Sequence, residues 1–316
     1  MRIFEAAATR KALHFEALIP ALRELFAQGC VVPPRHVHEI AAATGGAGVT
    51  SLVMPAWIPG RYFGLKVVNI APDNAARGLP ALHASYLLHD AETGTPLALI
   101  DGDQITARRT AAASALAASF LARADARHLL VVGAGQVARL LPAAYRVVRP
   151  IEQVTVWARR PQEAEALAHA LSDAGVAASA SRDLAHASGE ADVVSVATLA
   201  IAPLIEGRWL RPGCHLDLIG SFTPAMREAD DACFAGAALY VDTEEALQKS
   251  GDLLGPMQRG VFTAADLRGT LAALARGEAG GRRSDAERTV FKSVGSALED
   301  LAAAMLVHDG EVRRRA

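Results

Sequence analysis

A glycine-rich turn is the first stretch of this sequence whose residue types and spacing could do chemistry. The string G-A-G-Q-V-A at residues 133–138 follows the apolar run 129–132 and opens an amphipathic helical pattern. A dinucleotide-binding turn requires this context, because Gly133 permits the tight turn and Gly135 permits close approach of a pyrophosphate. Ala138 lets the helix lie near the strand. The sequence therefore predicts a nicotinamide dinucleotide site; the alternative is an ordinary tight connection between a strand and a helix.

The end of the next predicted strand bears on the choice of cofactor. Sites for NAD usually carry an acidic residue about 20 positions after the glycines, which binds the ribose 2′-hydroxyl. Here that place falls on Arg159 and Arg160, and no acid is present. A planar guanidinium can pair with a 2′-phosphate instead. We therefore expect NADPH in preference to NADH, with NADH possible; the alternative is that both arginines are solvated loop charges.

Three further cations could hold an anionic substrate. Arg109, with Arg108 beside it, lies near the start of an alanine-rich segment at 106–122 that we predict to be a helix. Arginine at a helix N-terminus makes a good carboxylate or phosphate clamp, although solvated arginines explain the pair equally well. Lys66 lies in an apolar, strand-like run, where an inward-pointing ammonium would need a partner or a lowered pKa; an exposed strand face is the alternative. Arg35 by itself gives no indication of its role.

The elements around these residues suggest two domains. Between residues 123 and 289, short apolar runs alternate with helical patterns, which implies a doubly wound parallel α/β sheet of the Rossmann type. The predicted strands are 129–132, 154–157, 176–179, 192–197, 214–219 and 238–241, and the predicted helices centre on 136–147, 161–174, 244–249 and 264–276.

The remaining parts, 1–122 and 290–316, are predicted to form a second, α+β domain. A helix is expected near 14–28, and a last helix at 290–307 should pack back onto this domain. The predicted strands of its mixed or antiparallel sheet, separated by turn residues, are 36–42, 49–54, 62–70, 82–88 and 96–100.

Composition excludes several classes of protein. The chain has 316 residues, of which 51% are hydrophobic, and 32 basic against 34 acidic residues give a net charge of −2. Nothing in this balance indicates nucleic acid or an anionic membrane surface as a partner. The three cysteines and the histidines lack metal-ligand spacing, so we expect no metal, and Asp192 is expected to be structural. No signal-peptide core or membrane-length apolar run is present, which favours a cytoplasmic protein with reduced thiols.

Six segments spread over the chain together form a pattern more specific than the glycine turn. They are MPAW (54–57), GLKVVN (64–69), GLPALHASYLLHDAETGTPLALIDGDQITARRTAAASALAA (78–118), VVGAGQVA (131–138), IGSFTPAMRE (219–228) and FKSVGSALEDLAAA (291–304). With these segments the chain resembles the ornithine cyclodeaminase/mu-crystallin family over nearly its whole length. That resemblance implies a Rossmann-type domain joined to a domain for substrate binding and dimerisation, and hence a homodimer.

The resemblance also implies roles for residues that are ambiguous alone. Arg35, Lys66 and Arg109 fall where members of the family bind the substrate carboxylate, and Lys66 and Arg109 are the expected catalytic residues. The expected contacts to the cofactor are Ser85, Arg109, Gly133, Gly135, Gln136, Val137, Arg159, Arg160, Thr198 and Ser293.

One departure from the family pattern bears on the reaction. Cyclodeaminases that resemble this chain carry an aspartate shortly after the fifth strand, and here that place is Phe222. A phenyl ring can neither transfer a proton nor hold an amine charge. The string G-S-F-T-P-x-M-R-E is instead similar to the branch that reduces the cyclic ketimines Δ1-pyrroline-2-carboxylate and Δ1-piperideine-2-carboxylate.

We therefore expect an NAD(P)H-dependent reductase that forms L-proline or L-pipecolate by hydride transfer. Two alternatives stay open. The first is another reaction of the family, namely ornithine cyclodeamination or the reductive amination of pyruvate by an alanine dehydrogenase. The second is a non-catalytic, NADPH-dependent small-molecule binding protein. The sequence also leaves open whether Lys66, Ser85, Thr198 or a water supplies the final proton.

Overall fold

The chain divides into two compact units. The structure, a computed structural model, describes residues 1–43 and 45–315. Unit 1 comprises Met1–Arg109 and Ser296–Ala316, and unit 2 comprises Thr110–Gly295. The sequence pattern predicted the corresponding changes near residues 122 and 290. The chain passes from unit 1 to unit 2 inside helix α3 (Gly102–Leu121) rather than at its end.

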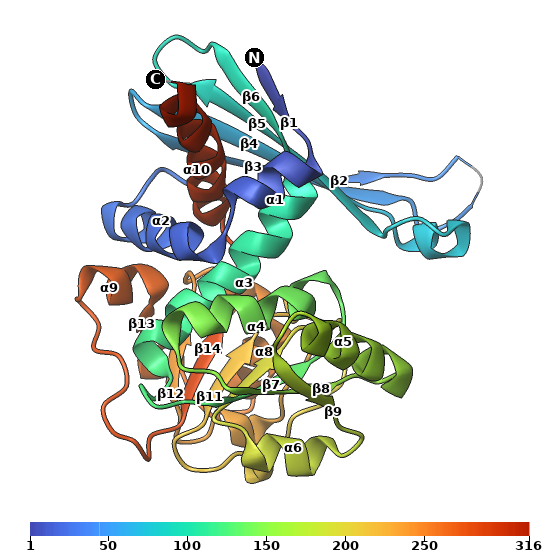
Figure 1. Cartoon of the computed structure of the whole chain (residues 1–316), viewed down its shortest axis with the longest axis vertical. Helices are drawn as coiled ribbons and strands as arrows, with labels where there is room; N and C mark the ends of the chain where they lie inside the picture. The colour runs from blue at the N-terminus through green and yellow to red at the C-terminus, as the bar shows by residue number, and fades with distance from the viewer. Residues whose placement is uncertain (44, 316) are drawn as a thin grey trace. The chain divides into compact units, whose positions relative to one another are not determined.

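Unit 2 contains the predicted doubly wound sheet, in which all paired strands are parallel (Figure 1). The strand order is β13-β12-β14-β11-β10-β7-β8-β9. The strands are β7 (His128–Val132), β8 (Gln153–Trp157), β9 (Ala177–Ala180), β10 (Val193–Val196), β11 (His215–Leu218), β12 (Ala238–Val241), β13 (Leu267–Thr270) and β14 (Thr289–Lys292). Because β7 lies between β8 and β10, the direction of winding reverses at β7, and ligands of such sheets bind at the carboxyl ends of the strands there.

Helices of unit 2 connect its strands, as the alternating sequence pattern predicted. They are α4 (Gln136–Val148), α5 (Pro161–Asp173), α6 (Leu184–Glu190), α7 (Ala246–Lys249), α8 (Gly251–Gln258) and α9 (Leu271–Arg276), with the 3-10 turns η2 (Gly207–Trp209), η3 (Asp231–Cys233) and η4 (Ala264–Asp266). Every residue of β10, β11, β12 and β14 is buried, as expected for a parallel sheet covered on both faces.

A buried carboxylate ties the centre of this sheet to its helices. Asp217 of β11 has no exposed surface. It accepts hydrogen bonds from the hydroxyls of Ser114 (3.1 Å), Tyr145 (2.9 Å) and Ser195 (2.5 Å). Since Ser114 belongs to the second half of α3, these bonds explain why that half of the helix is part of unit 2.

Two sequence predictions in this region were wrong. Residues 290–292, predicted as the start of the last helix, form the central strand β14 between β11 and β12, and the helix α10 begins only at Ala297. Residues 264–276, predicted as one helix, form η4, the edge strand β13 and the short helix α9. Thr270 ends the strand and caps α9, because its hydroxyl accepts the backbone N–H of Ala273.

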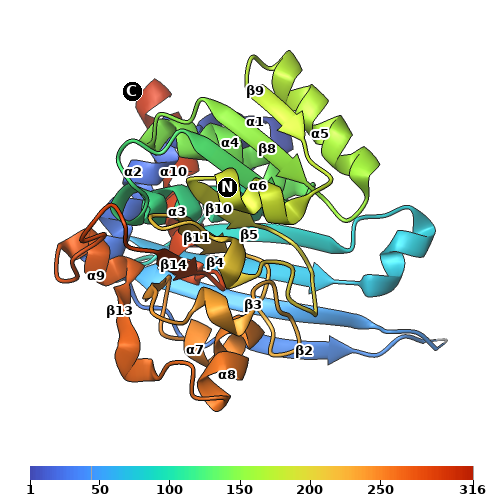
Figure 2. The same ribbon diagram turned by 90° about the horizontal axis from the view of Figure 1, so that it is seen from below.

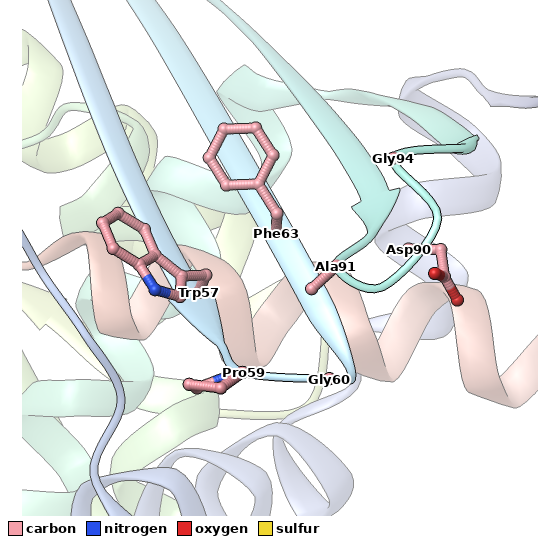
Figure 3. A pocket seen from close by; sticks show the side chains of 7 residues that line it. All are labelled: Trp57, Pro59, Gly60, Phe63, Asp90, Ala91 and Gly94. Atoms are coloured by element: carbon pink, nitrogen blue, oxygen red, sulfur yellow. The ribbon is translucent and has the colours of Figure 1, made fainter.

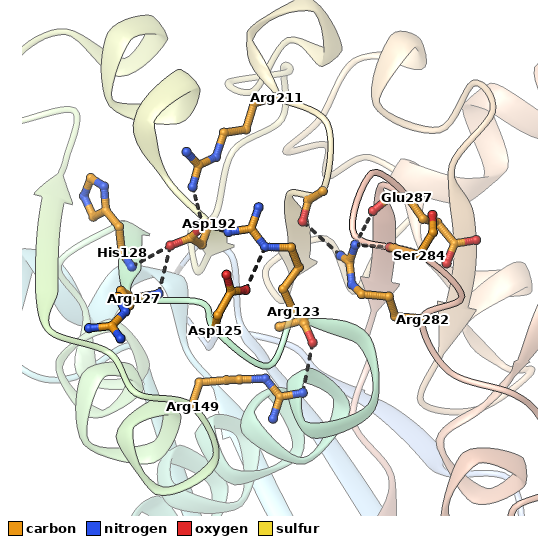
Figure 4. Close-up of polar contacts among 12 residues, drawn as sticks. Arg123, Asp125, Arg127, His128, Arg149, Asp192, Arg211, Arg282, Ser284 and Glu287 are labelled. Carbon is orange, nitrogen blue, oxygen red and sulfur yellow. Dashed lines mark hydrogen bonds and ion pairs between the residues drawn. The ribbon is translucent and has the colours of Figure 1, made fainter.

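The amino ends of several strands of unit 2 are held by Asp192, which agrees with its predicted structural role. One oxygen of this carboxylate accepts the backbone N–H groups of Arg127 and His128, at 2.8 and 2.9 Å. The other oxygen pairs with the guanidinium groups of Arg123 and Arg211 (Figure 4). Four donors around one buried carboxylate fix the starts of β7 and β10 and keep the pKa of Asp192 low, although burial alone would raise it.

Unit 1 contains a six-stranded sheet in the order β1-β6-β5-β4-β3-β2, antiparallel except for the pair β1 and β6. The strands are β1 (Arg2–Phe4), β2 (His36–Ile40), β3 (Val49–Ile58), β4 (Tyr62–Ile70), β5 (Leu82–Asp90) and β6 (Pro96–Asp101), and the helices are α1 (Ala6–Ala12), α2 (Phe15–Gln28) and α10 (Ala297–Arg315), with the 3-10 turn η1 (Pro72–Arg77). Helix α10 packs on β3 to β6, and α2 packs on α10. Figure 2 shows α2 and α10 side by side.

Among the described residues, no helix covers the other sheet face of unit 1, and the far end of this sheet extends as an arm. We call "the arm" β2, the adjoining part of β3, the end of β4, η1 and the start of β5, which project away from α2 and α10 in Figure 1. Every residue of β2 is exposed. Val37 and Ile40 each expose 54% of their surface, and Leu79 exposes 52%. No helix in the described part of the chain is long and apolar enough to cross a membrane.

Helix α3 begins earlier than predicted, which changes the interpretation of its arginines. Its first residue is Gly102, and the carboxylate of Asp101 accepts the backbone N–H of Gln104 at this end. Arg108 and Arg109 therefore lie more than one turn beyond the helix start, where the dipole acts weakly. A clamp made with a helix N-terminus was one of the two interpretations that the sequence left open, and the position of the helix start does not support it. Other groups must account for Arg109.

Candidate active site

The glycine turn of unit 2 has the form that a dinucleotide site requires. It connects the buried strand β7 to α4, and Gly135 is the N-cap residue. No side chain in the described part of the chain caps this helix, so its first N–H groups, at Gln136 and Val137, point out of the helix end. An anion such as a pyrophosphate is favoured at this position by the N–H groups and by the helix dipole.

The two glycines of the turn are required for different reasons. Gly133 has a φ of +123°, and a Cβ there would lie 2.5 Å from the carbonyl oxygen of Ala197. Gly135 has an ordinary φ of −75°, and a Cβ there would meet nothing within 4 Å. The fold itself explains the first glycine but leaves the space beside the second open. This open space beside a helix N-terminus fits a dinucleotide phosphate.

The residues after β8 match the predicted cofactor-selecting position only in part. Arg159 and Arg160 are both exposed and follow the carboxyl end of the strand. Arg160 is the N-cap residue of α5 and pairs with Glu163 in the first turn of that helix. Arg159 is therefore the better placed of the two to meet a 2′-phosphate.

Lys66 of unit 1 points into the protein and pairs with a carboxylate that the sequence analysis did not consider. Lys66 and Tyr86 are direct cross-strand partners, so they share the sheet face that α10 covers. The Nζ of Lys66 lies 2.5 Å from an oxygen of Asp300 on α10, and both residues are almost fully buried. Burial lowers the pKa of Lys66 to about 8, against the attraction of Asp300.

Arg109 joins the same carboxylate and a second one. Its Nε donates to the other oxygen of Asp300 at 2.9 Å, and its Nη1 donates to Glu299 at 2.7 Å. Burial disfavours the charged guanidinium, but the two carboxylates outweigh it and raise the pKa of Arg109. The cations Lys66 and Arg109 depress the pKa of Asp300 in turn. We call Lys66, Arg109, Glu299 and Asp300 the ionic cluster.

The ionic cluster brings together two of the three cations predicted to hold the substrate carboxylate. Only 1% of Lys66 and 7% of Arg109 are exposed. The third cation, Arg35, is half-buried just before β2. Ser85 is exposed and pairs across the sheet with Val67. Since neighbouring residues of a strand point to opposite faces, Ser85 lies on the sheet face opposite Lys66.

Two loops follow the carboxyl ends of β10 and β11 in unit 2, and they carry Thr198 and Phe222. Thr198 is half-buried, and its Cγ2 would lie 3.6 Å from a Cβ at Gly133. It therefore lies against the glycine turn, as expected for a cofactor contact. Phe222 exposes 40% of its surface. Ser293 directly follows β14 and is buried.

A cavity of about 460 Å³ lies in unit 1, and no residue of the ionic cluster lines it (Figure 3). It lies against the turns that follow β3 and β5, and Trp57 and Phe63 supply aromatic walls. Its lining residues are Trp57, Pro59, Gly60, Phe63, Asp90, Ala91 and Gly94. Asp90 caps its own turn, accepting both the N–H and the hydroxyl of Thr93. None of the predicted site residues lines this cavity.

Comparison with known proteins agrees with the fold and with the sequence motifs. The chain is 44% identical over 286 residues to a Δ1-pyrroline-2-carboxylate reductase of Paracoccus denitrificans, covering 90% of each protein. Its structure is similar to that of Thermococcus litoralis Δ1-pyrroline-2-carboxylate reductase in complex with NADH and L-proline, with a TM-score of 0.93 and 32% identity over 100% of this chain and 99% of that one.

An archaeal alanine dehydrogenase dimer with bound NAD is also similar, with a TM-score of 0.91 and 29% identity over 100% of this chain and 97% of that one. Residues 6–314 match the profile of the ornithine cyclodeaminase/mu-crystallin family. The match spans both units and includes the glycine turn, the ionic cluster and the loop that bears Phe222. The chain therefore belongs to the ornithine cyclodeaminase/mu-crystallin family.

Proposed function

We propose that this protein is an NAD(P)H-dependent reductase of cyclic ketimines, converting Δ1-pyrroline-2-carboxylate to L-proline and Δ1-piperideine-2-carboxylate to L-pipecolate. The observation that carries the proposal is the 44% identity to a Δ1-pyrroline-2-carboxylate reductase over most of both chains. Phe222 supports it, because a preformed iminium can accept hydride without an acidic residue at that position, whereas deamination of ornithine needs a proton-transferring group.

The proposed mechanism assigns different tasks to the two units. In unit 2, Gly133, Gly135 and the first N–H groups of α4 would hold the pyrophosphate of the dinucleotide. When bound there, the reduced dinucleotide would supply the hydride. In unit 1, Lys66 and Arg109 bind the substrate carboxylate, and fixing that carboxylate orients the imine carbon. Asp300 holds both cations at fixed distances before the substrate arrives.

A spectrophotometric assay at 340 nm tests the function. NADPH and NADH are each offered with the two ketimines, with pyruvate plus ammonia, and in reverse with ornithine and NAD⁺ or NADP⁺. We expect oxidation of the reduced cofactor with the ketimines. Turnover of pyruvate plus ammonia alone would indicate an alanine dehydrogenase, ammonia release from ornithine a cyclodeaminase, and binding without turnover a small-molecule carrier.

The pKa of Lys66 predicts the pH dependence of carboxylate binding. A lysine with a pKa of about 8 is a cation below that pH and loses its charge above it. The affinity for a carboxylate should therefore fall as the pH rises through 8. Cyclopentanecarboxylate is a suitable probe because it does not titrate in this range, and its inhibition constant should increase above pH 8. In Lys66→Met the inhibition constant should be larger and independent of pH between 7 and 9; a wild-type profile in this variant contradicts the assignment.

Arg159 predicts a preference for NADPH. An aspartate there would repel the 2′-phosphate and accept the ribose 2′-hydroxyl instead. Arg159→Asp should lower the ratio of kcat/KM for NADPH to kcat/KM for NADH by about tenfold or more, as expected for loss of a charged hydrogen bond of about 1.5–3 kcal/mol. Arg182→Asp, an exposed arginine in the loop after β9, should leave the ratio unchanged. Better use of NADH by the wild type would contradict the prediction.

We also propose that the protein is a homodimer formed through the uncovered sheet face of unit 1. On this face Trp57, Phe63, Leu65 and Leu87 are only half-buried, and the arm exposes further apolar side chains. A contiguous apolar face of this kind indicates an interface. Light scattering should give twice the 33.1 kDa of one chain, and Leu65→Asp should reduce the measured mass to that of one chain.

Reduced thiols at the three free cysteines are compatible with action in the cytoplasm.

A further inference from the structure

Glu228 is a fully buried carboxylate that the proposed reaction does not use. It lies in unit 2, in the segment after β11, and has no exposed surface. One oxygen accepts both the backbone N–H of Thr198, at 2.8 Å, and its hydroxyl, at 2.7 Å. The other oxygen accepts the backbone N–H of Gly220 at 2.7 Å. A single side chain thus joins the loop after β10 to the loop after β11.

Both loops lie at the carboxyl edge of the sheet, next to the glycine turn. Gly220 has no room for a side chain, because a Cβ there would lie 1.8 Å from the carbonyl oxygen of Thr198 and 2.4 Å from Glu228. Thr198 in turn lies against Gly133. Phe222 follows Gly220, and its N–H donates to the Gly220 carbonyl at 2.9 Å. Displacing Glu228 would therefore move Thr198 and the start of the Phe222 loop together.

The backbone of Glu228 is fixed as firmly as its side chain. Asp252 of α8 accepts the N–H groups of Glu228, at 2.8 Å, and of Ala229, at 3.1 Å. Lys292 of β14 is also buried, and its Nζ donates to the carbonyl of Leu218 at 3.0 Å. Asp252 and Lys292 are the charged groups that act on the Glu228 carboxyl, with opposite effects. Glu228 is therefore held at both ends in a place closed to solvent.

We propose that Glu228 is a positioning residue for the nicotinamide dinucleotide, which in its ionised form fixes Thr198 and Gly220 at the edge of the cofactor site. Three donors converge on its two oxygens, and only a carboxylate accepts all of them with full strength. A carboxylic acid would turn one acceptor into a donor and weaken the link between the loops. The proposal rests on the dinucleotide binding proposed above but not on the identity of the substrate.

The Glu228 carboxyl should ionise between pH 6 and pH 8, a range in which binding can be measured. Burial raises the pKa of Glu228 to about 7, with Lys292 opposing the rise and Asp252 adding to it. If only the ionised form holds the site, the apparent dissociation constant is the intrinsic constant divided by the ionised fraction. That fraction is about one-eleventh at pH 6 and about nine-tenths at pH 8, so the affinity should fall by about tenfold between pH 8 and pH 6.

Equilibrium titration of the dinucleotide without substrate tests this proposal. The probe is NADH, because its pyrophosphate stays ionised from pH 6 to 8, and quenching of tryptophan fluorescence reports binding. The wild type should bind NADH about tenfold more weakly at pH 6 than at pH 8. Glu228→Gln, whose amide cannot accept the Gly220 N–H without turning, should bind at pH 8 as weakly as the wild type at pH 6, and without dependence on pH.

Two further variants serve as a milder perturbation and as a control. Thr198→Val removes one of the three donors, so it should weaken NADH binding two- to fivefold but retain the dependence on pH. Glu190→Gln, which changes an exposed carboxyl at the last residue of α6, should behave as the wild type. The proposal would be overturned if the affinity of the wild type for NADH did not change between pH 6 and pH 8. It would also be overturned if the Glu228→Gln protein bound NADH with full affinity at pH 8. If Glu228→Gln does not fold, the wild-type pH titration and Thr198→Val decide.

Discussion

Gly135→Val is expected to abolish binding of the nicotinamide dinucleotide while leaving the protein folded. The Cβ direction of Gly135 is empty and its φ of −75° suits any residue, so valine costs the fold no more than about 1 kcal/mol as a poor N-cap. The side chain would project into the space where a pyrophosphate must approach. We expect the dissociation constant for NADPH and NADH to increase at least about 100-fold, equal to about 2.8 kcal/mol.

The other glycine of the turn provides the control. At Gly133 even a methyl group would lie 2.5 Å from a backbone oxygen, in a region of φ that favours glycine. Gly133→Ala should therefore lower the free energy of unfolding by about 1–3 kcal/mol. Urea unfolding and fluorescence titration of both variants separate the two effects. Normal nucleotide affinity in Gly135→Val would mean that the dinucleotide does not bind at this turn.

Arg109→Ala is expected to cause the largest loss of both stability and activity among single substitutions in unit 1. It breaks the buried ion pairs that Arg109 makes with Glu299 and with Asp300. Breaking a buried ion pair by removing one partner costs about 3–5 kcal/mol. The variant should also lose a contact that binds the substrate carboxylate, so its KM should rise steeply and its kcat should fall.

A milder substitution separates these losses. Arg109→Lys keeps the charge but cannot bind two carboxylates with one planar group, so it should unfold at a moderately lower denaturant concentration and show kcat/KM reduced by about 100-fold. Arg108→Ala is the matched control, because Arg108 contacts the carbonyl of Leu13 and the ring of Phe15 rather than the ionic cluster. Near-normal kinetics in a folded Arg109→Lys protein would show that Arg109 does not bind the substrate.

The parts of the fold that local sequence determines could be predicted well. The strand, turn and helix from 128 to 148 appear almost at the predicted residues, because the apolar run, the glycines and the helical period are all adjacent in sequence. Strand β14 could not be recognised so easily. Thr289–Lys292 contains only four residues and precedes a helical pattern, and its burial depends on β11 and β12, which lie far away in the chain.

The candidate site, like the fold, could be predicted from the sequence only in part. Lys66 and Arg109 were singled out as cations that needed partners, but the sequence did not reveal the partners. Glu299 and Asp300 are followed by an apolar helical run, and adjacent acids on a helix are usually exposed to solvent. They are buried because α10 packs on the sheet that contains Lys66. Only the contact between the C-terminal helix and strands more than 200 residues earlier identifies them.

The composition of the ionic cluster has a consequence for the rate at which substrate arrives. Lys66 and Arg109 contribute two positive charges, and Glu299 and Asp300 contribute two negative ones. The three ion pairs among them measure 2.5, 2.7 and 2.9 Å. Their fields cancel beyond a few ångströms, so an approaching anion experiences little long-range steering. Association should therefore be slower than for an unpaired cationic pocket but almost insensitive to ionic strength, and kcat/KM should stay nearly constant when salt is raised to physiological concentrations.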